Sequence, residues 1–170
     1  GFNQALIFYH FGSLNELFLA AVDFLSSQRV AEYRERVEGV TSVAELIRVA
    51  ADLHRQDVDR GHITVLAQLL AGATTAPELR APLRERFSPW IEVAEQAIER
   101  VVAGTPYAAV LPVGDLAFVV TALFMGMELT MTLEPDKERE ERLFRNIGLL
   151  AQMADLLLGA GTPPAPEAPA

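Results

Sequence analysis

The sequence predicts an all-α protein, and three observations support this fold class. Apolar residues recur at helical spacing from one end of the 170-residue chain to the other. Alternating apolar and polar runs bounded by turn residues, which are typical of strands, are almost missing. Serine or threonine followed three residues later by glutamate, the pattern of a helix capping box, recurs between the apolar segments. Because 51% of the residues are hydrophobic, the helices have enough apolar surface for a sizeable core.

The first two helices are expected on either side of a glycine. A short helix over residues 2–11 ends at Gly12. Ser13 and Glu16 then form a capping box at the start of a long helix, which Gly39 ends. The apolar stripe of this long helix consists of Leu14, Leu17, Phe18, Ala21, Leu25, Tyr33 and Val37.

Two more helices are expected in the next thirty residues. Ser42 and Glu45 form a second capping box, and the helix that they begin ends near Gly61. Its expected buried residues are Val43, Leu46, Ile47, Ala50 and Leu53. A short apolar helix is expected over residues 63–70.

A long helix follows and contains two prolines. Thr75 and Glu78 form a third capping box, and the helix continues to a stop at Gly104. Pro82 and Pro89 each remove a backbone donor, so we expect a bend or break around residues 78–89.

Two final helices complete the expected fold. Residues 105–114 form a loop, and residues 115–133 form a helix that is almost entirely apolar. The last helix covers residues 136–158, with a solvated, charged start that includes residues 138–141. One side of its later turns is apolar, with Leu143, Ile147, Leu150, Ala154 and Leu157. The proline-rich tail, residues 161–170, is expected to be disordered.

Composition excludes several classes of protein. The chain has no cysteine, which removes disulfides, thiolate zinc sites and cysteine nucleophiles. No secretion signal is visible, so a cytoplasmic location is expected. The segment 116–133 reaches the minimum length for a membrane span, but Glu128 interrupts it and no basic residues flank it, so no membrane contact is expected. The net charge of −9 means that any contact with DNA must come from a local patch.

The first 18 residues, GFNQALIFYHFGSLNELF, resemble the end of the helix-turn-helix of tetracycline-repressor (TetR) family transcription regulators. The similarity lies in Gly1 and Phe2, in the run Phe8-Tyr9-His10-Phe11, and in the capped long helix that follows. The resemblance implies that the short helix over residues 2–11 is the recognition helix, and that two earlier helices are missing from this sequence. It also implies the end of a DNA-binding domain over 1–40, an effector-binding and dimerisation domain over 41–160, and a disordered tail over 161–170.

The short first helix would therefore meet the major groove of double-stranded operator DNA. Gln4 has the amide that bonds adenine bidentately, and Tyr9 and His10 have donors for phosphate oxygens. Asn3 would cap the helix beside the phosphates. The expected DNA-binding residues are Asn3, Gln4, Ala5, Phe8, Tyr9 and His10.

The sequence departs from the family pattern at polar positions. The usual threonine is Leu6, the first tyrosine is Phe8 and the lysine of the turn is Leu14. No lysine or arginine precedes Arg29. Phosphate affinity from this segment alone should therefore be weak, and most of it would come from the earlier helices. The alternative is a helix that simply packs on the core.

An effector pocket is expected between the helices of the second domain, lined by apolar and aromatic side chains with a few polar groups. The expected wall residues are Leu66, Leu70, Phe87, Trp90, Phe118 and Met125, with plain core packing as the alternative for each. Glu128 is the only charged side chain deep in the apolar helix, and it would bind a ligand group or pair with an arginine. His54 would be a polar handle in the core or the pocket.

Metal and enzyme chemistry receive little support. His54, Asp57 and His62 are suitable ligand types, but their spacing matches no strong motif, so neither a metal nor a cofactor is expected. No glycine-rich phosphate loop, G-x-S-x-G or H-E-x-x-H occurs, so no catalytic residue is expected.

Together these observations predict a DNA-binding transcriptional regulator. It would be a repressor that a hydrophobic small-molecule effector releases from its operator. It would be a homodimer through the helices 115–133 and 136–158, which form a self-complementary interface. The alternative is a helical, dimeric ligand- or partner-binding protein that has lost DNA recognition.

Overall fold

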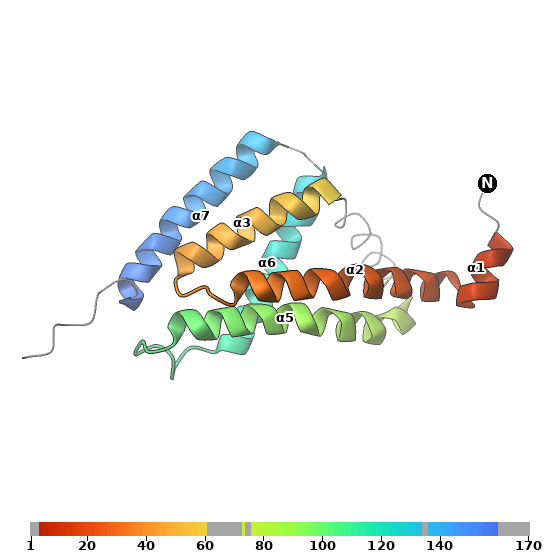
Figure 1. The fold of residues 1–170 in the computed structure, drawn as a ribbon, viewed down its shortest axis with the longest axis horizontal. Helices are drawn as coiled ribbons and strands as arrows, with labels where there is room; N and C mark the ends of the chain where they lie inside the picture. Colours follow the sequence, from red (N-terminus) through yellow and green to blue (C-terminus); the bar gives the residue numbers. More distant parts are fainter. Residues whose placement is uncertain (1–3, 61–72, 74–75, 134–135, 160–170) are drawn as a thin grey trace, which may run out of the picture.

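The computed structural model describes residues 4–60, 73, 76–133 and 136–159. This part of the chain is all-helical and contains no strand, which confirms the predicted fold class (Figure 1). Its helices are α1 (Gln4–Phe11), α2 (Leu14–Val37), α3 (Val43–Arg60), a 3₁₀ turn η1 (Pro77–Leu79), α5 (Arg80–Val102), α6 (Val113–Leu133) and α7 (Lys137–Leu158). The short helix expected over 63–70, Thr75 of the third capping box, and the tail over 161–170 lie outside the described residues.

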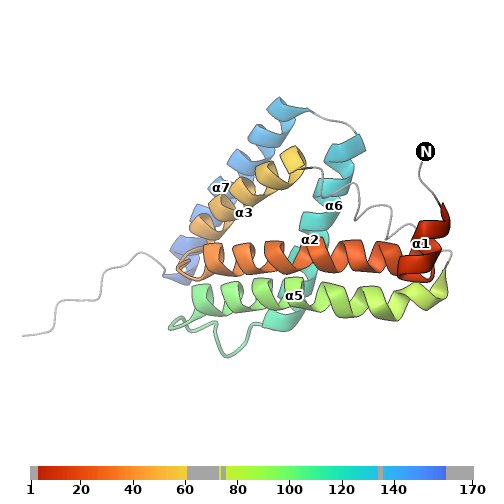
Figure 2. The same ribbon diagram turned by 45° about the vertical axis from the view of Figure 1, so that its right-hand side comes forward.

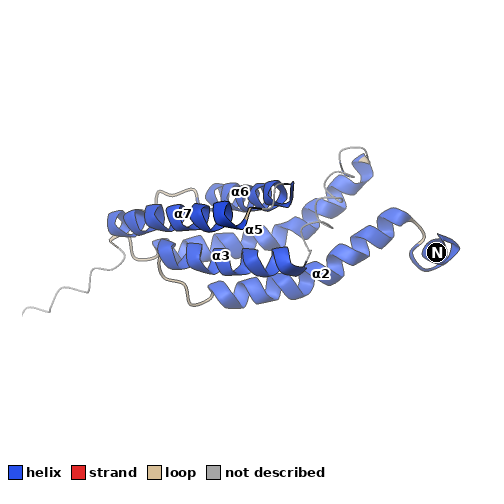
Figure 3. Ribbon diagram, turned by 90° about the horizontal axis from the view of Figure 1, so that it is seen from above, coloured by secondary structure: helices blue, strands red, loops and turns tan. Residues whose placement is uncertain are grey.

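The helices pack in three layers. α2 contacts α3 and α5, α3 contacts α7, and α5 contacts α6. Seen from above, α6 and α7 lie on the side of the molecule opposite α2, with α3 and α5 between them (Figure 3). α1 packs on α2, at the end of that helix farthest from α7 (Figures 1 and 2). α2 therefore connects the short first helix to the body of the bundle.

The helix starts follow the capping residues in the sequence. The Glu16 N–H donates to Ser13 Oγ (3.1 Å), and the Glu45 N–H donates to Ser42 Oγ (3.1 Å). At the last helix the Arg139 N–H donates to Asp136 Oδ1 (3.0 Å). Each oxygen satisfies one of the N–H groups that a helix start leaves without an intrahelical acceptor, so the expected boundaries at these three points are confirmed.

α5 is one helix through its prolines, so of the bend or break expected around residues 78–89 the break is not observed within it. The chain makes the η1 turn first and begins α5 at Arg80. Pro82 lies in the first turn, where its missing N–H has no intrahelical acceptor to lose. Pro89 lies inside the helix, which continues to Val102. Only one interior hydrogen bond is therefore missing, and packing of α5 against α2 and α6 outweighs that loss.

α7 packs inward through a face that overlaps only in part with the predicted one: Leu143, Ile147 and Ala154 are half-buried. Ala151 and Asp155 are the buried residues of this helix. Leu150 and Leu157, expected on the buried side, are 65% and 77% exposed. The later turns of α7 are apolar on both sides, so spacing alone did not show which side faces α3.

Asp155 ties the end of α7 to the start of α3. Its Oδ1 accepts from the Val43 N–H (2.6 Å) and its Oδ2 from the Ala44 N–H (2.9 Å). The carboxylate is buried and satisfies two free donors at the positive end of the α3 dipole. Sequence reasoning missed this cap because Asp155 lies more than a hundred residues from its partners.

Asp155→Ala is expected to lower the free energy of unfolding by about 2 kcal/mol, because two partly buried N–H groups lose a charged acceptor. Urea unfolding followed by circular dichroism measures this change. Gln152→Ala, an exposed position on the same helix, is the matched control and should change stability by less than about 0.5 kcal/mol. Equal losses in the two variants would show that the cap does not stabilise the fold.

Candidate functional site

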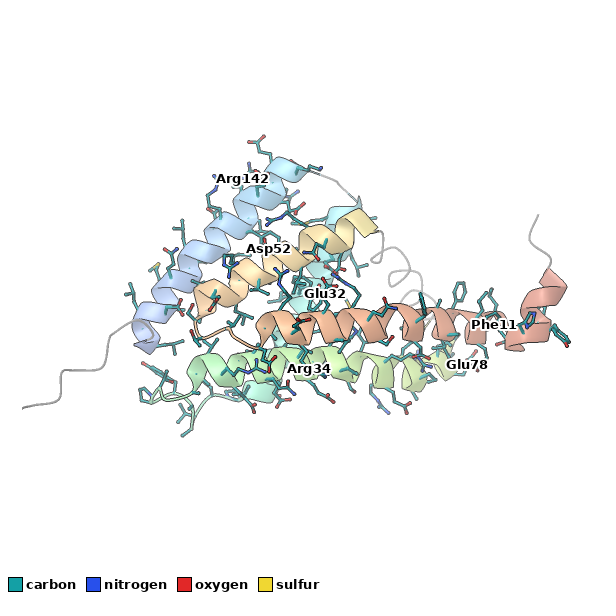
Figure 4. The ribbon with its side chains drawn as sticks, viewed as in Figure 1. Phe11, Glu32, Arg34, Asp52, Glu78 and Arg142 are labelled. Atoms are coloured by element: carbon teal, nitrogen blue, oxygen red, sulfur yellow. The ribbon has the colours of Figure 1, made fainter. Side chains whose placement is uncertain are left out.

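A cluster of polar side chains lies inside the bundle, where four helices meet. We call it the polar cluster; its members are Arg29 and Tyr33 on α2, His54 and Asp57 on α3, Glu128 on α6 and Glu140 on α7. Figure 4 labels Glu32, which binds Arg29, on the edge of α2 that faces α3. Buried polar groups cost free energy unless they are paired, so the contacts within the cluster decide whether it stabilises the fold.

Arg29, Asp57 and Tyr33 form one half of the polar cluster. The buried Arg29 guanidinium pairs with the buried Asp57 carboxylate, and its NH1 lies 2.5 Å from Glu32 Oε2. The Tyr33 hydroxyl donates to Asp57 Oδ2. The guanidinium carbon also lies 5.2 Å from the centre of the Tyr33 ring, a cation–π arrangement. This half joins α2 to α3.

The ionisation of these groups follows from burial and from Asp57. Burial acts to lower the pKa of Arg29, but Asp57, Tyr33 and Glu32 outweigh it, so the pKa lies above its ordinary value. Burial and then the Asp57 carboxylate raise the pKa of Tyr33 well above its usual range. At neutral pH Arg29 is therefore charged and Tyr33 is a neutral hydrogen-bond donor.

His54, Glu128 and Glu140 form the other half. His54 is fully buried, with Nδ1 3.4 Å from Glu128 Oε1 and Nε2 3.5 Å from Glu140 Oε1. The rings of Phe124 and Phe144 pack around the imidazole, with centroids 6.0 Å and 5.3 Å away. One histidine of α3 thus lies between carboxylates of α6 and α7.

Glu128 is buried, and burial raises the pKa of its carboxyl above the ordinary value. The hydrogen bond with His54 opposes this shift, and the negative charge of Asp57 adds to it. The protonated form of Glu128 therefore extends to higher pH than in a solvated glutamate.

The structure brings together some of the predicted pocket residues. His54 and Glu128 are in contact, and Trp90 packs edge-on against Tyr33 with ring centroids 5.0 Å apart. Met125 lies half-buried one residue after Phe124. Leu66 and Leu70 lie outside the described residues.

Two of the predicted wall residues lie away from the polar cluster. Phe118 is 60% exposed, because it lies ten positions before Glu128 and this spacing places the two side chains on different faces of α6. Phe87 packs against a separate core group around Leu19 and Leu83. The aromatic side chain of α6 that packs against the His54 imidazole is Phe124.

Sequence reasoning missed several members of the polar cluster. Arg29 and Tyr33 were noted only as a first basic residue and an apolar stripe position. Asp57 was considered as a metal-ligand type, yet it is buried and pairs with Arg29. Glu140 was assigned to a solvated helix start, yet its side chain is 17% exposed and lies beside His54. The available signal was spacing: Glu140, Phe144 and Ala151 share the inward face of α7.

The expected DNA-contact residues lie on α1. Phe8, Tyr9 and His10 are exposed, Tyr9 at 82%, and the rings of Tyr9 and His10 meet edge to face at 5.0 Å. Asn3, and the side chains of Gln4 and Ala5, lie outside the described part. Figure 4 labels Phe11 at the end of α2 that is distant from the α7 helix.

Exposed apolar residues gather on α6 and α7. We call this surface the α6–α7 face; its residues are Phe118, Val119, Val120, Leu123 and Leu133 on α6, and Leu149, Leu150, Met153, Leu156 and Leu157 on α7. Both helices lie on the side of the molecule opposite α2 (Figure 3). An apolar surface that spans two helices is typical of an interaction site.

Two features of the described residues bear on metal binding and on membrane insertion. They contain no group of three histidine, cysteine, aspartate or glutamate side chains that could hold a metal ion. His62 of the metal hypothesis lies outside them. Within the described part, α6 is the one helix long and apolar enough to cross a membrane, by length and composition only.

Comparison with known proteins gives no assignment: no family model matches the chain, and neither a curated protein nor a solved structure matches it significantly.

Proposed function

We propose that this chain is part of a TetR-like transcription regulator, a cytoplasmic homodimer whose binding to operator DNA is controlled by a hydrophobic small molecule. One observation is central to the proposal. The exposed α1 residues lie at one end of α2, and Arg29 and Tyr33 of the same helix belong to the polar cluster inside the bundle. A single helix therefore connects the exposed α1 residues, which we propose read DNA, with the polar cluster.

DNA recognition rests on α1 and on the resemblance of its sequence to a recognition helix. Tyr9 and His10 offer donors to phosphate oxygens, which fix the position of a protein on the duplex. Gln4 and Ala5 would meet base edges, which specify the sequence. The described residues before Arg29 include no lysine or arginine, so this segment adds little of the charge on which DNA affinity depends.

Effector control would act through the polar cluster and α2. An effector between the helices would contact Trp90, Phe124 and the polar groups beside them. The effector shifts the equilibrium between the conformation that binds DNA and the one that does not only by the difference of its affinities for these two conformations. In the effector-bound state α2 would hold the two recognition helices of the dimer at a spacing that does not match successive major grooves.

Dimerisation through the α6–α7 face supplies the second recognition helix. Ten large apolar residues are exposed there, and a second copy would cover them. A twofold interface is self-complementary, so one apolar face suffices for both partners.

The alternative is a helical dimer that binds a ligand or a partner but not DNA. One specific observation favours it: Leu14, which stands where the family usually has a lysine, is half exposed beside α1 and offers no charge to a phosphate. A gel-shift assay with the protein at its natural length and the DNA upstream of its own gene separates the two functions. A sequence-selective, salt-sensitive shift supports the regulator, and no shift supports the alternative.

Tyr9→Phe is expected to weaken binding to every DNA sequence about five- to tenfold, because one hydrogen bond to a phosphate is lost without a change in base readout. Fluorescence anisotropy on operator and scrambled duplexes measures this effect. Tyr107→Phe is the matched control, since Tyr107 is an exposed tyrosine in the segment between α5 and α6. Equal DNA affinity of the Tyr9 variant and the native protein would show that the Tyr9 hydroxyl does not contact DNA and would contradict the role of α1 as the DNA-binding helix.

A further inference from the structure

His54 lies between two carboxylates inside the bundle, and this geometry constrains its protons. Nδ1 faces Glu128 and Nε2 faces Glu140, at 3.4 Å and 3.5 Å. A neutral imidazole has one N–H, so it donates to only one of the two carboxylates. Its other nitrogen then turns a lone pair toward a carboxylate oxygen. In the described structure His54 Nε2 is buried and makes no hydrogen bond.

One additional proton removes this conflict in either of two arrangements. An imidazolium donates from both nitrogens to two carboxylates. Alternatively, the acid form of Glu128 donates its O–H to Nδ1, and the N–H of Nε2 donates to Glu140. Both arrangements contain the same number of protons, so they are two forms of one protonated state.

We propose that Glu128, His54 and Glu140 together bind one proton, and that release of this proton loosens α6 and α7 from α3. Glu128, His54 and Glu140 lie on α6, α3 and α7, so each hydrogen bond formed by the His54 imidazole joins α3 to α6 or to α7. Charge-assisted hydrogen bonds have lengths of about 2.7–2.9 Å, so full bonding draws both helices closer to α3.

The other groups around this triad are already engaged with one another. On α2, Arg29 pairs with Asp57 and Glu32, and Tyr33 donates to Asp57. On α5 the nearest aromatic neighbour of Tyr33 is Trp90, which does not titrate. The negative charge of Asp57 favours proton binding at Glu128, and the positive charge of Arg29 opposes it.

The direction of the pH effect follows from linkage. In the unfolded chain the shared proton lies on the solvated imidazole, whose ordinary pKa is about 6.5. In the folded chain two carboxylates flank the imidazole at 3.4 Å and 3.5 Å and favour the state that holds the proton. The folded chain therefore holds the proton at pH values where the unfolded chain has released it, so this contribution to stability is fully present below about pH 6.5 and is lost as the pH rises above that value.

The test compares the pH dependence of unfolding in three proteins: the natural sequence, Glu140→Gln and Glu138→Gln. In Glu140→Gln the side-chain amide can donate to His54 Nε2 while the N–H of Nδ1 donates to Glu128. Both hydrogen bonds of the imidazole then form without the additional proton. From about pH 6.5 to about 8.5 the unfolding equilibrium constant of the natural protein should rise by up to about tenfold per pH unit more than that of Glu140→Gln. Glu138→Gln is the control, because Glu138 lies on the same helix with its side chain 90% exposed, and it should match the natural protein.

A second readout uses the folded natural protein alone. Nuclear magnetic resonance of the His54 ring and of the Glu128 carboxyl should show both signals changing together at one midpoint, because the proton is shared. Equal pH slopes in the natural protein and Glu140→Gln would overturn the proposal. Independent midpoints, with Glu128 titrating at its ordinary value, would do the same. Neither experiment involves DNA, so a failure of this proposal can be distinguished from a failure of the proposed function.

Discussion

Arg29→Met is expected to lower the free energy of unfolding by about 3–5 kcal/mol, because it leaves the buried Asp57 carboxylate without its cation. The variant also removes the pairing with Glu32 and the cation–π contact with Tyr33. Chemical denaturation followed by circular dichroism measures the loss. Because Arg29 joins α2 to α3, the effect should appear in one cooperative transition.

Two control variants distinguish the loss of the buried Arg29–Asp57 pair from the general effect of removing a positive charge. Arg34→Met, on an exposed position of the same helix labelled in Figure 4, should change stability by less than about 0.5 kcal/mol. The double variant Arg29→Met with Asp57→Asn should lose less than the sum of the single variants, since no buried charge remains uncompensated. A loss of under about 1 kcal/mol for Arg29→Met would show that the pair contributes little.

Leu123→Lys is expected to weaken dimerisation by on the order of 100-fold or more, because it places a charge in an apolar interface. Leu123 is exposed in the single chain and lies within the α6–α7 face. In a twofold dimer the substitution occurs twice, so its cost is doubled. Sedimentation equilibrium over a range of concentrations measures the change in the dissociation constant.

The matched control is Val110→Lys. Val110 is also an exposed apolar residue, but it lies between α5 and α6 and outside the α6–α7 face. It should leave the dissociation constant unchanged. If the natural protein is a monomer at every concentration, or if both variants dissociate equally, the α6–α7 face is not the dimer interface.

The helices were predictable because their signals are local. The capping pairs at Ser13 and Ser42 lie within one turn of the helices that they begin, and the structure shows their hydrogen bonds. Asp155 gave no such signal. It caps α3 from α7, and only the folded chain brings the two ends together.

The site was predictable in part. His54 and Glu128 were recognisable because polar side chains on apolar helix faces need partners. Their actual partners were not recognisable, because Glu140 lies in a charged run that usually faces solvent. Arg29, Tyr33 and Asp57 were missed for the same reason: the pairing between α2 and α3 depends on how those helices cross, which spacing within one helix does not determine.

Errors arose where a helix is apolar on more than one face. Leu150 was placed on the buried side of α7, and it belongs to the exposed side. Phe118 was placed in a pocket wall, and it belongs to the α6–α7 face. In both helices the number of apolar residues exceeds what one packed face requires, which is the same property that favours a dimer.

We propose that this chain belongs to a dimer that reads DNA through α1. Selection of duplexes from a random library by the protein at its natural length, near physiological salt, tests this proposal. We expect enrichment of an inverted repeat whose half-sites lie about one helical turn, or a multiple of it, apart. Recovery of duplexes with no common sequence, bound no more tightly than the starting library, would contradict it.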